Sequence, residues 1–429
     1  MEDAYILGKT NIKGFFVVVG TSSRTLVLVR INDDSKSNVK KFYAELPAGL
    51  VLITFGRFIS NIAYRLVFPF LPTISRGLGV STGTMGTALA MRDLVEISSP
   101  LLGKITDKRG TAQAMVAGIC GLGMAAALQG ASSGLILFVF ALVLASISKN
   151  SFDIGSSAWT GASVPFDKRS RAIGLIETTW ALSFVIGMPV AAVLIRAGTW
   201  RTPFLVTSIL CAVTGVVFHL FLPKSEAKAE PQSVSRLSPT ARFALLAMVA
   251  LGCGHMMMLV TFAVFLEDQH GLSTSGLGFI ALVIGVAELI GSGGVAIFGD
   301  RFGKVKVVKV ALILSLPLSI FLPLGESSIW AALLLISFWF ICTESVIVSM
   351  LSTCTELDRK ARGAMMGFVY AGWAFGRFFG AIIGARVYEN SGMRPVSIIM
   401  ALALGFAFLI VLKAFGVSGE LEDRDISLS

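Results

Sequence analysis

Apolar segments of membrane-spanning length alternate with short basic or glycine-rich turns along most of the chain. A transmembrane helix needs about 20 predominantly apolar residues. Six such segments lie in residues 46–222 and six in residues 243–415: 47–73, 82–103, 112–131, 134–158, 172–196 and 202–222, then 243–266, 275–298, 306–324, 329–351, 364–387 and 394–415. The pattern predicts an all-α membrane protein of 12 transmembrane helices, here called spans one to twelve in chain order.

The polar segments outside these spans predict two tails and a linker. Residues 223–242 are rich in Lys, Glu, Pro and Ser, which is typical of a solvated linker. Residues 1–45 are polar and mixed, and the apolar stretch at 15–20 is too short for the core of a signal peptide. We therefore expect a cytoplasmic tail at residues 1–45, although a start codon assigned too far upstream would give the same pattern. A second cytoplasmic tail is expected at residues 416–429.

Composition excludes several classes of protein. Of the 429 residues, 55% are hydrophobic and 14% are charged, and the mean hydropathy is +0.80, which rules out a water-soluble enzyme. The formal net charge of +10 does not indicate a nucleic-acid partner, because the Lys and Arg residues form short clusters between the apolar segments. The five cysteines have no paired spacing, so we expect neither a disulfide framework nor a zinc site. No other metal site and no cofactor are expected.

The basic residues also predict an orientation, because Lys and Arg are enriched in cytoplasmic loops. Alternate loops carry Lys104, Lys108, Arg109, Lys168, Arg169, Arg171, Lys224, Lys228, Arg236, Arg242, Arg301, Lys304, Lys306, Lys309, Arg359, Lys360 and Arg362. The loops on the other side carry chiefly Arg76, Arg196, Arg201, Arg386 and Arg394. We therefore expect a plasma-membrane protein with both termini and the linker in the cytoplasm.

The two halves of the chain repeat one another. A separation of 193 residues pairs Asp107 with Asp300, Gly110 with Gly303, Arg169 with Arg362, Gly174 with Gly367, Trp180 with Trp373 and Gly187 with Gly380. Distant motifs that share one offset indicate a duplication. Parallel six-helix halves with a substrate site near the midplane are the plan of a large class of secondary carriers. The sequence therefore predicts two pseudo-symmetric six-helix bundles.

The turns after spans two and eight share a motif. Its members are Gly103, Asp107, Arg109 and Gly110 in the first copy, and Asp300, Arg301 and Gly303 in the second. These turns resemble the G-x-x-x-D-R-x-G-R signature of the major facilitator superfamily, which occurs at this place in each half. The first copy departs from the signature at Lys108 and Thr111, and the second at Ala296. The likeness covers about residues 45–415 and implies the fold of that superfamily.

Further segments are similar to one branch of the superfamily, the drug:proton antiporters and sugar exporters. In span five, residues 183–189 (Ser-x-x-x-Gly-Met-Pro) are similar to the G-x-x-x-G-P motif of the drug:proton exchangers. The segments 65–72 and 198–204 also look like this branch. The resemblance implies export of drugs, sugars or purines, and it implies that spans one, four, seven and ten line the substrate path.

A physical role for the loop motif follows from the helix dipole. A carboxylate can stabilise the positive N-terminal end of a helix in the other half. We expect Asp107 to contact the start of span eleven near Gly363. Asp300 is expected to contact the start of span five near Ala172. Because such contacts form only when the cytoplasmic side is closed, the motif would act as a gate; the alternative is that Asp107 only tightens its turn.

Charged residues within the spans are costly in a membrane, so they are candidates for function, with structural ion pairing as the alternative. The spacing in span one places Arg57, Asn61 and Arg65 on one helical stripe. We predict that this stripe faces the substrate cavity. The other cavity candidates are Arg92, Lys149, Asp153, His255 and Arg377. A lone histidine such as His255 is more often packed in a core than functional.

Carboxyl groups in apolar surroundings are candidates for proton coupling. Glu177 in span five and Glu288 in span eight have no oppositely charged neighbour within four positions on their own helices. Glu177 is the first candidate and Glu344 the second. The alternative for Glu177 is a structural partner on another helix, such as Lys149 or Arg377.

Span two carries a trio of charges, Arg92, Asp93 and Glu96. Arg92 and Glu96 are four residues apart and can pair on one helix face. The trio is therefore either a structural brace or a proton site, and an arginine of span one, Arg57 or Arg65, could pair with Asp93.

Small residues recur at every fourth position of span eleven, at Gly372, Gly376, Gly380 and Gly384. This spacing predicts a seam where two helices approach closely. Span five carries a matching stripe of Ser183, Gly187 and Ala191, and Pro189 can loosen its backbone. The role of these residues is expected to be mechanical.

Motifs that do not occur narrow the function. The sequence has no phosphate-binding G-x-x-x-x-G-K-[ST] loop and no H-E-x-x-H zinc helix. We therefore predict a secondary active transporter rather than an enzyme. The transporter is expected to export a drug-like or metabolite substrate in exchange for protons by alternating access. Proton-coupled uptake or uniport is the alternative, followed by a membrane sensor or an intramembrane enzyme. The expected partners are the small-molecule substrate, protons and the lipid bilayer, and the protein is expected to be a monomer.

Overall fold

The computed structural model describes residues 48–97, 99–222, 237–357 and 362–416, and every regular element in this part of the chain is a helix. The predicted N-terminal tail lies outside the described residues, as do most of the predicted linker and of the C-terminal tail. From Gly49 onward the described residues belong to one unit.

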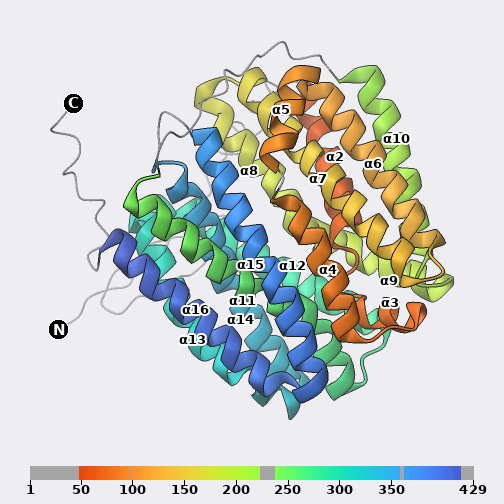
Figure 1. Cartoon of the computed structure of the whole chain (residues 1–429), viewed down its shortest axis with the longest axis vertical. Coiled ribbons are helices and arrows are strands. Elements are labelled where there is room, and N and C mark those ends of the chain that lie inside the picture. The colour runs from red at the N-terminus through yellow and green to blue at the C-terminus, as the bar shows by residue number, and fades with distance from the viewer. Residues whose placement is uncertain (1–47, 98, 223–236, 358–361, 417–429) are drawn as a thin grey trace, which may run out of the picture. The chain divides into compact units, whose positions relative to one another are not determined.

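The helices follow the predicted spans, which confirms the all-α fold (Figure 1). In the first half they are α2 (Ala48–Arg65), α3 (Leu71–Leu78), α4 (Thr82–Glu96), α5 (Ser99–Arg109), α6 (Thr111–Ala131), α7 (Leu135–Ser163), α8 (Phe166–Leu182), η1 (Ser183–Gly187), α9 (Met188–Ala197) and α10 (Thr202–Phe221). In the second half they are α11 (Pro239–His270), α12 (Thr274–Phe302), α13 (Lys304–Phe321), η2 (Leu322–Glu326), α14 (Ile329–Cys354), α15 (Arg362–Ser391) and α16 (Met393–Phe415).

Among the described residues, ten helical segments are long and apolar enough to cross a membrane. The two remaining predicted spans are interrupted. Span one consists of α2 followed by a turn at residues 66–70 and then α3, and span two is divided into α4 and α5. Pro100 accounts for the second break, because proline has no amide hydrogen and is favoured in the first turn of a helix.

The glycine seams pack in the same way in the two halves. In α15, Gly380 lies so close to α11 that an added Cβ would come within 2.3 Å of the Cys253 carbonyl oxygen. Gly187, at the matching position in span five, lies against α2, and an added Cβ would come within 2.6 Å of Ile62 Cγ1. Each seam therefore packs against the first span of its own half, as a duplicated fold requires.

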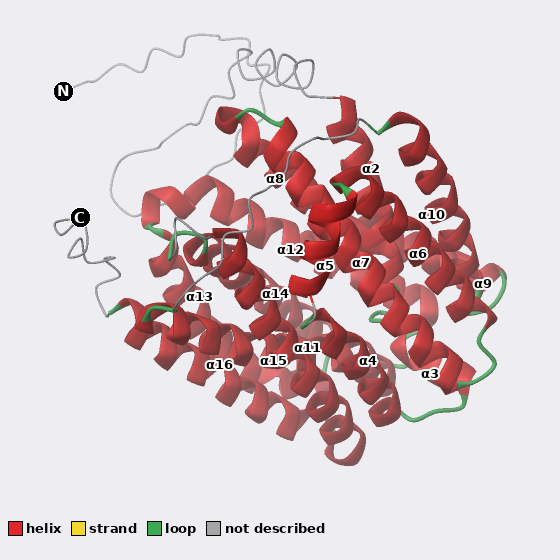
Figure 2. Cartoon of the chain, turned by 45° about the horizontal axis from the view of Figure 1, so that its top comes forward, coloured by secondary structure: helices red, strands yellow, loops and turns green. Residues whose placement is uncertain are grey.

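Two sets of helices meet at the boundary between the halves. α4 packs against α15, and α12 packs against α8, η1 and α9. Figure 2 shows the first of these contacts, with α4 beside α15. Spans two and eleven on one side, and spans five and eight on the other, therefore line the boundary.

The loop motif forms the same turn in each half. Gly110, between α5 and α6, has φ +94°, and Gly303, between α12 and α13, has φ +84°. Residues with a Cβ rarely adopt such angles, which explains glycine at this position in both copies. We call the end of the helices that holds these turns the motif end. The other end, which holds the turns at Gly271 and Gly392, is called the opposite end.

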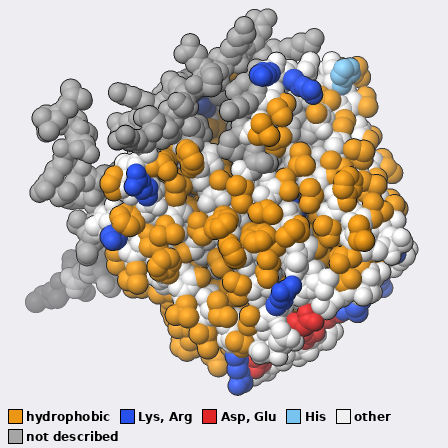
Figure 3. Space-filling view, viewed as in Figure 1, with side chains coloured by type: hydrophobic (Ala, Val, Ile, Leu, Met, Phe, Trp, Pro, Cys, Tyr) orange, Lys and Arg blue, Asp and Glu red, His pale blue; other side chains and the backbone are white. Residues whose placement is uncertain are grey.

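The outer surface of the helices is apolar. Figure 3 shows hydrophobic side chains over most of the face in view. Ile136 is 88% exposed, and Ile297 and Trp330 are each 73% exposed. Such a surface is unfavourable in water and is accommodated by lipid, in which helices satisfy their own backbone hydrogen bonds.

Candidate functional site

The charged residues of the spans gather in three clusters. The first, which we call the Arg377 cluster, joins α15 of the second half to α4 of the first half. Arg377 Nη2 lies 2.7 Å from Asp93 Oδ1, and Arg377 Nη1 lies 3.4 Å from Glu96 Oε2. Arg92 Nη2 is also 3.3 Å from Asp93 Oδ1. The Tyr64 hydroxyl donates to Glu96 and accepts a hydrogen bond of 3.2 Å from Arg377 Nη2. Asp93 therefore lies between two guanidinium groups, which offsets the cost of burying its charge.

Two expected pairings in span two are wrong. Arg92 contacts Asp93 rather than Glu96, and Asp93 is paired with Arg377 rather than with an arginine of span one. Both errors have the same cause. Asp93 and Glu96 both pair with Arg377, which comes from a helix of the other half, and spacing along span two cannot reveal this partner.

The second cluster, the Arg65 cluster, joins α2 of the first half to α12 of the second half. Arg65 Nη1 and Nη2 lie 2.9 and 2.6 Å from the two carboxylate oxygens of Glu288, and both side chains are 1% exposed. The Arg65 guanidinium carbon lies 4.2 Å from the centre of the Trp180 ring and 3.5 Å from that of Phe184. The expectation that Glu288 lies in apolar surroundings is therefore wrong, because its partner is an arginine of the other half.

Span five changes its winding beside this cluster. α8 ends at Leu182, η1 (Ser183–Gly187) is a π-helical turn, and α9 continues from Met188 through Pro189. The antiporter-like motif thus coincides with the π-turn. Turns of this kind occur frequently at functional sites.

The third cluster, the Arg57 cluster, lies two turns closer to the start of α2 than Arg65 does. Arg57 pairs with one carboxylate oxygen of Asp153, and the other oxygen lies 2.5 Å from Lys149 Nζ. Arg57 Nη2 lies 3.5 Å from Glu177 Oε1. The Glu177 side chain is 58% exposed, so its expected apolar surroundings are wrong as well. Its partner is Arg57 rather than Lys149 or Arg377.

Asn61 lies between these two clusters on the predicted stripe of span one. Its Nδ2 donates to Thr179 Oγ1 of α8 at 3.0 Å, and both side chains are buried. The stripe of span one therefore contacts span five at successive levels, through Arg57, Asn61 and Arg65.

Glu344 differs from the other carboxylates of the spans. It is half-buried on α14 and forms no hydrogen bond or ion pair with the described part of the chain. Its helix packs on α12, and a Cβ added to Gly291 would lie 3.0 Å from the Glu344 Cβ. Gly291 follows Glu288 by three residues, so Glu344 lies about one helical turn from the Arg65 cluster.

His255 lies in an aromatic group within the second half. Its ring is 6.0 Å from that of Trp339, 6.0 Å from that of Phe340 and 5.4 Å from that of Trp373. The residue is 4% exposed. These contacts favour the packing interpretation of His255 over a place in the substrate cavity.

The gate prediction depends on Asp107 and Asp300, whose side chains lie outside the described part of the structure. Arg109 and Arg301 are exposed at the motif end, and Gly103 lies on α5. α5 contacts α15, and α12 contacts α8. The helices that the prediction names are therefore neighbours, while the gating contacts stay a prediction.

Contacts at the opposite end were not expected from the sequence. Arg76 at the end of span one lies 2.7 Å from Glu267 of α11. Glu389 of α15 accepts hydrogen bonds from the Gly83 amide, at 2.5 Å, and from the Ser81 hydroxyl, at 2.9 Å. Both contacts join the two halves. Their only signal in the sequence is a charged residue at each end of a span, which does not identify the partner.

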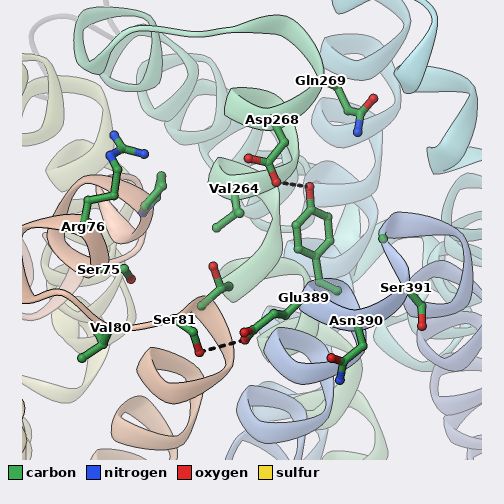
Figure 4. A pocket seen from close by; sticks show the side chains of 14 residues that line it. Ser75, Arg76, Val80, Ser81, Val264, Asp268, Gln269, Glu389, Asn390 and Ser391 are labelled. Atoms are coloured by element: carbon green, nitrogen blue, oxygen red, sulfur yellow. Dashed lines mark hydrogen bonds between the residues drawn. The ribbon is translucent and has the colours of Figure 1, made fainter.

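A pocket of about 540 Å³ lies beside these contacts. Figure 4 shows Arg76, Ser81, Asp268 and Glu389 around it, with the Ser81 hydroxyl hydrogen-bonded to Glu389. The Tyr388 hydroxyl donates to Asp268 at 2.9 Å on the same side. This pocket lies at the opposite end, away from the three charged clusters of the spans.

Comparison with known proteins points to one family. The model of the Major Facilitator Superfamily matches residues 53–358. The chain is 22% identical over 416 residues to the "Uncharacterized MFS-type transporter YwfA" of Bacillus subtilis (strain 168). This alignment covers 93% of this chain and 100% of that protein. It is 24% identical over 380 residues to the "Multidrug resistance protein MdtG" of Enterobacter lignolyticus (strain SCF1), covering 83% and 90% of the two chains.

The fold is also that of solved transporters. The crystal structure of the human organic anion transporter MFSD10 (TETRAN) matches with a TM-score of 0.67 at 18% sequence identity. The match covers 85% of this chain and 100% of that chain. At this identity the likeness concerns the fold alone.

Proposed function

Because the chain belongs to the Major Facilitator Superfamily, we propose that it is a proton-coupled exporter of a drug-like or metabolite substrate. It would work as a monomer in the plasma membrane, with the motif end and both termini in the cytoplasm. The relatives named multidrug resistance proteins support export of drugs. The basic loops at the motif end support the orientation.

The observation that carries this proposal is that charged pairs join the two halves at the depth of the membrane. Arg65 with Glu288, and Arg377 with Asp93 and Glu96, connect helices of different halves. If the halves rock about a central site, contacts between them must break and re-form. Protonation of a carboxylate removes one charge from such a contact, so proton binding would bias which side of the carrier is open.

Two carboxylates are suited to exchange protons with water during this cycle. Glu177 is largely exposed and has one ionic contact, of 3.5 Å, to Arg57. Glu344 is half-buried without a partner in the described residues. Asp93 and Glu288, by contrast, are buried and paired. We assign proton exchange to Glu177 and Glu344, and assign the holding of the two halves to Asp93, Glu96 and Glu288.

The contacts at the opposite end support an inward-open state. The pair Arg76–Glu267 and the bonds of Glu389 join the halves on that side. Glu177 is exposed on α8, whose first residue, Phe166, lies at the motif end. A carrier closed outside and open inside would take up its substrate from the cytoplasm, as export requires.

Transport by purified protein in proteoliposomes tests the proposal. An imposed pH gradient should drive movement of at least one compound from a panel of drugs, sugars and nucleosides. E177Q and E344Q should lose most of the response to the gradient, because the amide cannot exchange a proton. The matched control is E326Q, since Glu326 lies at the opposite end and pairs with Arg394 of its own half. Unchanged gradient-driven transport in both E177Q and E344Q would contradict proton coupling at these residues.

A further inference from the structure

The Trp180 carbonyl in span five receives two hydrogen bonds from side chains. The Ser183 hydroxyl donates at 2.6 Å, and Arg65 Nη1 donates at 2.7 Å. Trp180 lies just before the π-turn at Ser183–Gly187. A π-turn accommodates one extra residue and displaces helical amides from the carbonyl groups four residues back. The two side-chain donors satisfy a carbonyl at the place where the helical pattern changes.

Of these two donors, only Arg65 comes from another helix. Its guanidinium contacts the rings of Trp180 and Phe184, which lie on either side of the start of the π-turn. The same group is fixed from the second half by both carboxylate oxygens of Glu288. A single buried side chain therefore connects the change of winding in span five to span eight.

We propose that Arg65 is a positioning residue that fixes the winding of span five. By donating to the Trp180 carbonyl it holds the extra residue of the π-turn in place, and this winding keeps Glu177 beside Arg57. The functional consequence rests on the proposed role of Glu177 in proton exchange. The winding itself does not depend on that role.

The geometry gives a definite alternative winding. If the π-turn became an ordinary α-turn, the segment before it would rotate by about 100° about the helix axis. Each residue of α8 would then occupy the place that its predecessor holds now. Trp180 would take the place of Thr179 beside Asn61, and Glu177 would take the buried place of Ile176. Glu177 would lose its contact with Arg57.

Cross-linking of cysteine pairs distinguishes the two windings in purified protein. The five native cysteines, which are unpaired, are first replaced. One reporter pair is N61C/T179C, at the position of the 3.0 Å hydrogen bond between these side chains. The other is N61C/W180C. An oxidant or a short bifunctional thiol reagent should join the first pair and not the second while Arg65 is present.

Replacement of Arg65 should reverse this pattern. In R65L the link at position 179 should be lost and the link at position 180 gained. Because R65L leaves Glu288 unpaired at a buried site, the same pairs are also measured in R65L/E288L, which removes both charges. The matched control is R57L, because Arg57 binds side chains of α7 and α8, and in the described part of the chain it donates to no carbonyl of span five. R57L should keep the link at 179.

Three results would overturn the proposal. The first is the same cross-linking pattern with and without Arg65, and the second is a reversal in R57L as well. The third is no link at 179 while Arg65 is present, since the winding would then differ from the one described. The cross-linking assay does not measure transport, so the two proposals can fail separately. If replacement of Arg65 reverses the cross-linking pattern but the transport assay shows no proton coupling, only the proposed function is rejected.

Discussion

The two boundaries between the halves share a backbone plan and differ in chemistry. Where α15 meets α4, Arg377 binds Asp93 and Glu96 directly across the boundary. The matching position in span five, 193 residues earlier, is Phe184. Phe184 carries no charge and instead covers the guanidinium of Arg65. The duplication is therefore visible in the helices and the glycine seams, while each boundary has its own ion pairs.

This difference determines how each boundary responds to the loss of a charged residue. The Arg377 cluster is a network in which two arginines face two carboxylates, Asp93 and Glu96. The Arg65 cluster is one closed pair with no second cation at hydrogen-bonding distance among the described residues. Breaking a buried pair leaves an uncompensated charge, whereas removing both partners does not. Substitutions at the two boundaries should therefore separate the network from the single pair.

The largest effect is expected at Arg377. R377L removes the guanidinium that pairs with both Asp93 and Glu96, so it should lower the free energy of unfolding by about 3–5 kcal/mol. R377L/E96L restores a balance of one cation and one carboxylate and should regain most of that loss. Thermal unfolding of the purified proteins, followed by size-exclusion chromatography, measures both. An R377L protein as stable as the parent, or a double variant less stable than R377L, would contradict the network.

Much of the fold could be predicted because it depends on local patterns. The apolar periods mark the helices, and the offset of Gly187 and Gly380 marks the repeat. The partner of Glu288 could not be predicted, because it is set by the packing of spans one and eight, which are far apart in the sequence. The exposure of Glu177 depends on the same kind of information.

The π-turn of span five was also beyond prediction. An extra residue in one turn leaves the composition of residues 183–187 unchanged, and these residues read as a continuous apolar helix. The similarity of residues 183–189 to an antiporter motif marked the place without giving its geometry. The gating role of Asp107 and Asp300 stays a prediction, since their side chains lie outside the described residues.

A smaller effect should separate the two glycine seams. G380A places a Cβ 2.3 Å from the backbone carbonyl of Cys253, which cannot move without displacing α11. G187A places a Cβ 2.6 Å from Cγ1 of the Ile62 side chain, and a side-chain atom can shift without displacing the backbone of α2. G380A should therefore lower the free energy of unfolding by about 1–3 kcal/mol, the usual range for overpacking, and G187A should lower it by less.

The same unfolding assay measures the difference between the seams. A matched substitution in α15 is G367A, because Gly367 has open space around its Cβ position. G367A should leave the unfolding temperature near that of the parent. If G187A proved as damaging as G380A, the seams would be equivalent in rigidity and the distinction between backbone and side-chain contact would be wrong.

The smallest expected effect concerns the contacts at the opposite end. The Glu389 carboxylate accepts from the Gly83 amide at the start of α4, where a negative charge interacts favourably with the helix dipole. E389Q keeps a hydrogen-bond acceptor but removes the charge. The free energy that favours the closed state of this end should therefore fall by about 1 kcal/mol at most. That energy corresponds to a change of roughly fivefold in the ratio of open to closed states.

Labelling of a cysteine at position 75 reports this change. Ser75 is buried and lines the pocket at the opposite end, so S75C should react faster with a membrane-impermeant thiol reagent when that end opens. E326Q is the control, because Glu326 pairs with Arg394 within its own half and should leave the labelling rate unchanged. Equal rates in E389Q and the parent would show that the charge of Glu389 does not hold the halves together. Closure of the opposite end would then depend on other contacts, such as the ion pair between Arg76 and Glu267, which also joins the halves there.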